Sequence, residues 1–185
     1  MPSFAAAVLL PAVLWAALSD LLYRKIHNAL VLVLLLGWLA LPLLAALGLK
    51  PWPDLVLVQV FSHVAWSLLG GAVVLLVGYG LFALRRVGAG DVKLMAVLCL
   101  WMGYHEQVTF LIVTSLIGGL LALGLPLVEL VERLLAGPLV ALNRRFPNCG
   151  INPPSVLDQD RTPGIPYGIA IALGTVFTLC VHLPS

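Results

Sequence analysis

Two aspartates, Asp20 and Asp91, each lie at the edge of a long apolar run of the chain. A carboxylate is costly to keep in such a position, and charged residues at a membrane helix are functional candidates. Asp91 follows the stretch Gly88-Ala89-Gly90, and glycine lets a substrate backbone approach a neighbouring carboxylate closely. Taken alone, Asp91 has a simpler alternative role as the cap of a helix. The two carboxylates are the first candidates for a catalytic pair.

A pair of close carboxylates is suited to the hydrolysis of an amide bond. Two like charges a few ångströms apart do not both ionise easily, so such a pair shares one proton. The ionised member takes a proton from water, and the protonated member polarises the carbonyl and later helps the amine to leave. This chemistry requires no metal ion and no other cofactor, so none is expected. Asp91 lies at the start of a helix, where the dipole favours the ionised form, and Asp20 lies near the end of one, where the dipole disfavours it. This favours Asp91 as the base and Asp20 as the acid, but Arg24, one turn after Asp20, favours the reverse.

The remaining acidic residues are poorer candidates, because exposed charges mostly belong to solvated surfaces. They fall in turns, in a polar loop or beside basic residues: Asp54, Glu106, Glu129, Glu132, Asp158 and Asp160. The three cysteines, Cys99, Cys149 and Cys180, form no CxxC pair, so neither a zinc ribbon nor a redox pair is indicated.

The composition requires lipid around most of the chain. Of the 185 residues, 62% are hydrophobic and 10% are charged, and the mean hydropathy is +1.09. A soluble domain is closer to half apolar and a quarter charged, and so short a chain cannot bury the excess in a core. The net charge of +2, without a basic stripe, gives no indication of nucleic-acid binding.

Six apolar segments approach the length of about 20 residues that a helix needs to cross a membrane. The predicted helices are residues 4–23, 29–49, 55–84, 92–102, 108–131 and 165–183. The fourth is short, and an interruption at 103–107 separates it from the fifth. The first is too long for a signal peptide and has no basic residue before it. We therefore expect one all-α, polytopic membrane bundle of about six helices over residues 1–185, with a polar cytoplasmic loop at 137–163.

The basic residues orient this bundle, because cytoplasmic turns of membrane proteins are rich in Lys and Arg. With the N-terminus outside, nine of the ten basic residues lie on the cytoplasmic side and only Lys50 lies outside. Six crossings then place the C-terminus outside as well. Two crossings separate Asp20 from Asp91, which returns both to the cytoplasmic face and makes their proximity possible.

Three segments, in the right order, resemble the motifs of the type IV prepilin peptidases, which are intramembrane aspartyl proteases. Val87–Leu94 resembles their GxGD signature, Asp20–Asn28 their first-aspartate motif, and Pro166–Ala172 the motif of their last helix. The matching positions in this chain are Asp20, Arg24, Asn28, Gly88, Gly90, Asp91, Lys93, Pro166, Tyr167 and Gly168.

The resemblance implies a six-helix peptidase of the bacterial inner membrane, with Asp20 and Asp91 as the catalytic pair. Its substrates would be prepilins or pseudopilins, cut at the cytoplasmic boundary between a basic leader and an apolar helix. Such a helix would sit in lipid beside the bundle while the leader stays in the cytoplasm. Pilus-assembly machinery is a further implied partner.

The chain departs from the family pattern in three places. His27 stands where the family usually has proline, so the turn after the first helix is expected to be less rigid. Nothing before the first helix corresponds to the methylating domain of the long members, so we expect cleavage without methylation, as in the short tight-adherence (Flp) pilus peptidases. The segment 137–163 is longer than expected for a short member. We interpret it as a connector, with a substrate-gating loop as the alternative.

Two functions of other classes remain as alternatives. A small transporter would use Asp91 as a proton relay, but it would need an acid near the middle of the bilayer, and both aspartates lie at its boundary. A structural subunit of a pilus or secretion complex would use Asp91 only as a helix cap, and it would tolerate alanine at both positions.

Overall fold

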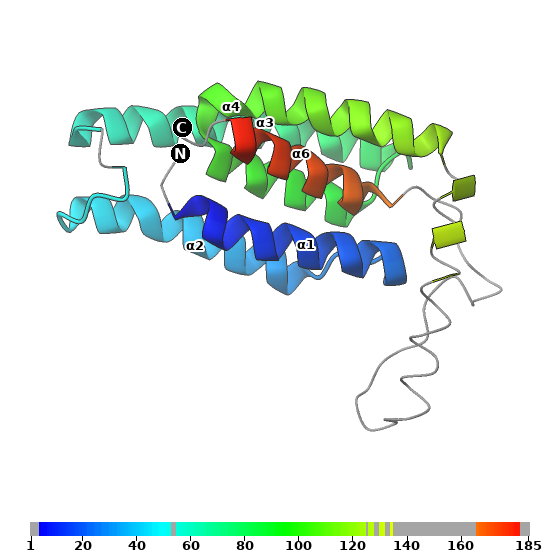
Figure 1. Cartoon of the computed structure of the whole chain (residues 1–185). Coiled ribbons are helices and arrows are strands. Elements are labelled where there is room, and N and C mark those ends of the chain that lie inside the picture. The colour runs from blue at the N-terminus through cyan, green and yellow to red at the C-terminus, as the bar shows by residue number, and fades with distance from the viewer. Residues whose placement is uncertain are drawn as a thin grey trace.

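The computed structural model describes residues 4–52, 55–124, 126–127, 130–131, 134 and 166–181. Its helices, in chain order, are α1 (Ala5–Tyr23), α2 (Asn28–Ala46), α3 (Leu57–Ala83), α4 (Ala89–Leu123) and α6 (Tyr167–Val181). Figure 1 shows them packed lengthwise in one bundle, with the start of α1 and the end of α6 at the same end. No strand occurs among these residues, so the all-α prediction is confirmed for the described part of the chain.

Four of the helices, α1 to α4, are long and apolar enough to cross a membrane, and α6 is a shorter apolar helix. Their outward faces carry large apolar side chains, such as Leu14 (68% exposed), Trp15 (60%) and Leu76 (73%). Exposed apolar surface on this scale needs lipid to cover it. The protein is therefore a multi-pass membrane protein, whereas the side on which its termini lie stays a prediction.

The interruption predicted at 103–107 is reduced to a single residue. Only Gly103 leaves the helical conformation inside α4, with φ 73° and ψ 163°. Helix continues directly from Tyr104, so the predicted loop 103–107 is wrong. A positive φ is available to glycine at little cost, which lets one residue make the break. The described helices number five, one of them broken, so the predicted count of about six is not confirmed.

The two segments of α4 lie side by side instead of end to end. Gln107 donates its side-chain amide to the carbonyl of Cys99 over 2.9 Å, although eight residues of straight helix span about 12 Å. Figure 1 shows the second segment running back along the first. Both ends of α4 therefore lie towards the end of the bundle where α1 ends.

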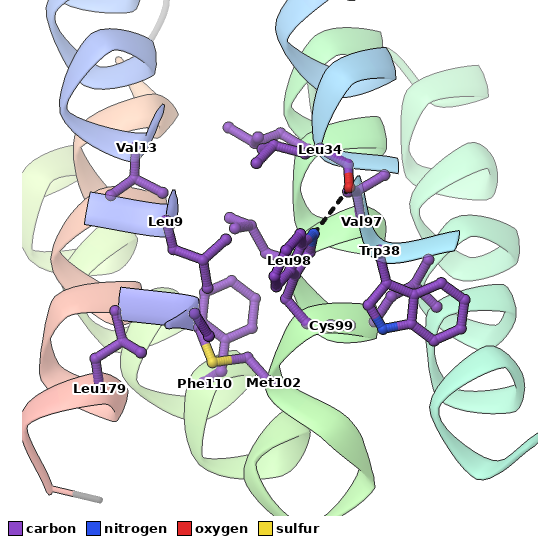
Figure 2. Packing of buried hydrophobic residues seen from close by; sticks show 14 of the residues in the cluster. Leu9, Val13, Leu34, Trp38, Val97, Leu98, Cys99, Met102, Phe110 and Leu179 are labelled. Atoms are coloured by element: carbon purple, nitrogen blue, oxygen red, sulfur yellow. Dashed lines mark hydrogen bonds between the residues drawn. The ribbon is translucent and has the colours of Figure 1, made fainter. Parts of the chain in front are cut away.

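The core lies where α4 packs against its neighbours α2, α3 and α6 and where α6 packs on α1. Figure 2 shows part of this core, which is made of fully or almost fully buried side chains that include Leu9, Val13, Leu34, Trp38, Leu98 and Phe110. The Trp101 indole donates a 2.9 Å hydrogen bond to the Leu34 carbonyl, drawn as the dashed line in Figure 2. These contacts hold the first segment of α4, which also carries Asp91, against α2.

Several sequence predictions lie outside the described residues. They concern the polar loop 137–163 and the residues Asp54, Glu129, Glu132, Cys149, Asp158 and Asp160.

Candidate active site

A cavity of about 330 Å³ lies where α1 ends and where α2 and α4 begin. We call it the two-aspartate cavity, because Asp20 and Asp91 both line it. Its other lining residues are Arg24, Lys25, Ile26, Asn28, Gly88, Ala89, Gly90 and Lys93. The structure thus brings together every predicted site residue from the first-aspartate motif and the GxGD motif.

Asp20 is held at the end of α1 by its own backbone and by α6. Its side chain is only 7% exposed, and its Oδ2 accepts a 2.7 Å hydrogen bond from the backbone amide of Gly168. Its carbonyl accepts the amide of Arg24, which ends α1 in the left-handed conformation with φ 53°. Arg24 itself lines the two-aspartate cavity.

Asp91 lies in the first turn of α4, three residues after the N-cap residue Gly88. The Gly88 backbone amide hydrogen-bonds the Asp91 carboxylate, which is one half of a capping box. Asp91 therefore does contribute to capping α4, although the N-cap residue is Gly88 and not Asp91. The carboxylate is only half-buried, it lines the cavity, and it is close enough to Asp20 for an electrostatic interaction.

The two aspartate segments contact each other through the glycine next to Asp91. A Cβ on Gly90 would lie 3.1 Å from the Cβ of Ile26, in the connection between α1 and α2. Lys93, one turn after Gly90, donates from Nζ to Oδ1 of Asn28 over 3.3 Å. These contacts place the start of α4 directly against the turn that follows Asp20.

Ser19 is a site residue that the sequence reasoning missed. It is 7% exposed, and its hydroxyl donates a 2.7 Å hydrogen bond to the carbonyl of Lys25. Nδ1 of His27 lies 3.2 Å from the same hydroxyl oxygen. A hydroxyl has one proton to donate, so His27 is the donor in this second bond. A serine directly before Asp20, together with a histidine in place of proline, was the signal available in the sequence.

The three residues predicted from the last-helix motif have different positions. Gly168 reaches Asp20 directly. Tyr167 packs against α4, where a Cβ on Gly118 would lie 2.8 Å from its ring. Pro166 is buried just before α6, and its carbonyl accepts the amide of Ile169 over 3.2 Å. Tyr167 and Pro166 therefore orient α6, while Gly168 contributes to the site.

A family model described as the type IV leader peptidase family matches residues 7–123, which is more than half of the chain. The chain belongs to the type IV leader peptidase family. This membership confirms the resemblance drawn from the motifs, and it implies that the protein is a peptidase. Searches of curated proteins and of solved structures returned no match.

The residues matched by the leader peptidase model include both Asp20 and Asp91, whereas Gly168 lies beyond them. Among the described residues, no group of three or more His, Cys, Asp or Glu side chains is placed to hold a metal ion. The two-aspartate cavity of this leader peptidase presents two carboxylates, basic side chains and the backbone of a glycine-rich turn.

Proposed function

We propose that this protein is an intramembrane aspartyl endopeptidase that removes the basic leader from prepilin or pseudopilin precursors. One observation carries the proposal: Asp20 and Asp91, from helices far apart in the sequence, line one small cavity at the same end of the bundle. Membership of the leader peptidase family supports the same reaction class.

In the proposed reaction, one aspartate is ionised and the other holds a proton. The ionised carboxylate takes a proton from a water molecule, whose oxygen attacks the carbonyl carbon of the scissile amide. The protonated carboxyl donates its proton to the carbonyl oxygen as the tetrahedral intermediate forms. The C–N bond then breaks, and the amine leaves with a proton from the acid that the first step created. The hydroxyl that becomes the new carbonyl returns its proton to the other carboxylate, so the pair again holds one proton.

The surroundings of the pair suit a peptide substrate. Gly88, Ala89 and Gly90 present a strip of backbone with almost no side chain beside Asp91, which leaves room for a substrate backbone. The hydrogen bond from Gly168 holds the Asp20 carboxylate in one orientation. Catalytic groups held in place in this way avoid the entropy cost of ordering them during the reaction.

We place the site at the cytoplasmic face of the bacterial inner membrane, with both termini of residues 1–185 outside. Four basic residues lie in the two turns at this end of the bundle, Arg24, Lys25, Arg85 and Arg86, and Lys93 lies just inside α4. Such turns favour the cytoplasmic side. A precursor would reach them from the cytoplasm with its leader and from the lipid with its apolar helix. The pilus-assembly machinery that uses the product is a further proposed partner.

Co-expression of a Flp-type precursor with Asp20→Asn and Asp91→Asn variants tests this proposal. Each amide keeps the size of the carboxyl group but cannot act as the acid or base, so both variants should lose leader removal on an immunoblot. Glu106→Gln, three residues after the break in α4 at Gly103, is the matched acid-to-amide control and should cleave normally. Normal cleavage by either aspartate variant, at equal membrane level, would refute the paired mechanism.

A further inference from the structure

A second cavity, of about 590 Å³, lies between α3 and α4 beside the two-aspartate cavity. We call it the α3/α4 groove. Its lining residues are Ala72, Leu75, Leu76, Tyr79 and Phe82 of α3 and Ala89, Val92 and Lys93 of α4. Among the described residues that line the groove, Lys93 is the only charged one, so the groove suits an apolar ligand.

The groove and the two-aspartate cavity are continuous. Ala89 and Lys93 line both of them, and these residues flank Asp91 by two positions on either side. Polar surface with charged side chains therefore gives way to apolar surface within one helical turn of the candidate catalytic residue. A chain that crosses the site in this direction would pass from a polar into an apolar environment.

The groove follows α3 away from the aspartates. From Phe82 to Ala72 it extends over ten residues, or about 15 Å of helix, which is roughly half of the hydrocarbon thickness. Helices α3 and α4 approach each other closely beside the groove because α3 has a glycine, Gly78, at the contact. A Cβ at this position would lie 2.5 Å from a methyl group of Val92. Leu76 and Tyr79 are 73% and 66% exposed, so the groove opens towards the surrounding lipid.

We propose that the α3/α4 groove binds the apolar helical segment of the substrate that directly follows the scissile bond. This inference rests on the proposed function, and it assigns the substrate-binding surface of the same site. The substrate changes from basic to apolar at its cleavage point, and the protein changes from polar to apolar at Ala89 and Lys93. A helix embedded in lipid needs a lateral entrance to the aspartates, and the groove provides one beside Asp91.

Photo-crosslinking tests the position of the substrate. A photoreactive phenylalanine derivative replaces Leu76 in the groove or, as the matched control, the neighbouring Val77, which is also exposed (59%) but does not line the groove. In membranes that contain the full precursor, the probe at 76 should crosslink to the apolar segment and the probe at 77 should not. Crosslinks of equal yield from both positions, or crosslinks to lipid alone at 76, would overturn the proposal.

Steady-state kinetics test its function with two substrates, the full precursor and a short peptide that ends a few residues after the scissile bond. Ala72→Trp should fill the groove and raise KM for the full precursor by about tenfold or more, without changing cleavage of the short peptide. Val73→Trp, one position away and outside the lining, should leave both substrates unaffected. If Ala72→Trp impaired cleavage of both substrates equally, or of neither, the groove would not be the binding surface.

The two proposals fail in different ways. If Asp20→Asn and Asp91→Asn still cleave but the crosslink at 76 forms, the paired mechanism is wrong and the binding surface stands. If both aspartate variants are inactive but the crosslink is absent, the mechanism stands and the groove proposal is wrong.

Discussion

The backbone amide of Gly168 donates a 2.7 Å hydrogen bond to Oδ2 of Asp20, across 148 positions of sequence. Both residues are buried, and a buried carboxylate needs hydrogen-bond donors to offset the loss of water. The bond therefore fixes Asp20 and the start of α6 relative to each other. The close approach of the two residues also explains why position 168 is a glycine, because a Cβ there would lie 2.7 Å from the Cβ of Asp20.

Gly168→Ala should lower the rate of leader removal by about tenfold to a hundredfold, because small displacements of catalytic groups have effects of this size. The added methyl group must push Asp20 away or break its hydrogen bond. Gly119→Ala is the matched control on a helix, since a Cβ there meets nothing within 4 Å. It should leave the rate unchanged and keep or slightly raise the melting temperature. Equal rates for the two variants would show that Gly168 does not position Asp20.

Gly88→Ala should also slow cleavage, because its Cβ would lie 2.7 Å from Oδ2 of Asp91. The carboxylate would have to rotate away from the cavity or lose the Gly88 amide as a donor. The expected loss is about tenfold in kcat, with protein levels in the membrane unchanged. Gly80→Ala, near the end of α3 and free of contacts within 4 Å of the added Cβ, should behave like the parent protein. A fully active Gly88→Ala variant would show that Asp91 tolerates another orientation.

Ser19 and His27 should act together in holding the turn after Asp20. Loss of the Ser19 hydroxyl removes two hydrogen bonds, so Ser19→Ala should destabilise the protein by about 1–2 kcal/mol, measured as a lower melting temperature in detergent. Ser62→Ala is the control, because that hydroxyl bonds a backbone carbonyl on an exposed surface. It should change the melting temperature much less.

His27→Pro should keep the activity that His27→Ala loses. The φ of His27 is −73°, which proline adopts without strain, and Ile26 before it is not helical, as proline requires of its predecessor. The proline ring would then supply the rigidity that the Ser19 bond supplies here. If His27→Pro is as impaired as His27→Ala in leader removal, the imidazole has a role beyond holding the turn.

Gly103→Ala should destabilise the protein without a direct effect on chemistry. Its backbone conformation, with φ 73° and ψ 163°, is almost restricted to glycine and costs another residue about 1–3 kcal/mol. Its Cβ would also lie 2.7 Å from the ring of His63. The additional variant His63→Ala should relieve the clash with the ring but not the backbone strain, so it should recover only part of the melting temperature. Full recovery would mean that the positive φ is not required for α4 to fold back.

Local properties of the sequence were enough to predict the class of the fold and most helix ends. Hydropathy marked the helices, and α1, α2, α3 and α6 begin and end within three residues of the predicted limits. The interruption of α4 was seen, but its extent was overestimated, because polar residues such as His105 and Glu106 are tolerated in a helix. Whether they form a loop depends on their surroundings, which the local pattern does not contain.

The two candidate aspartates were also visible in the sequence, since each carboxylate interrupts an apolar pattern and an even number of crossings returns both to one face. Tertiary packing decided which other groups complete the cavity. The contact of Gly168 with Asp20, the bonds of Ser19 and the groove between α3 and α4 depend on how helices rotate and approach each other. Those choices arise from side-chain packing between residues far apart in the chain, and neither spacing nor hydropathy specifies them.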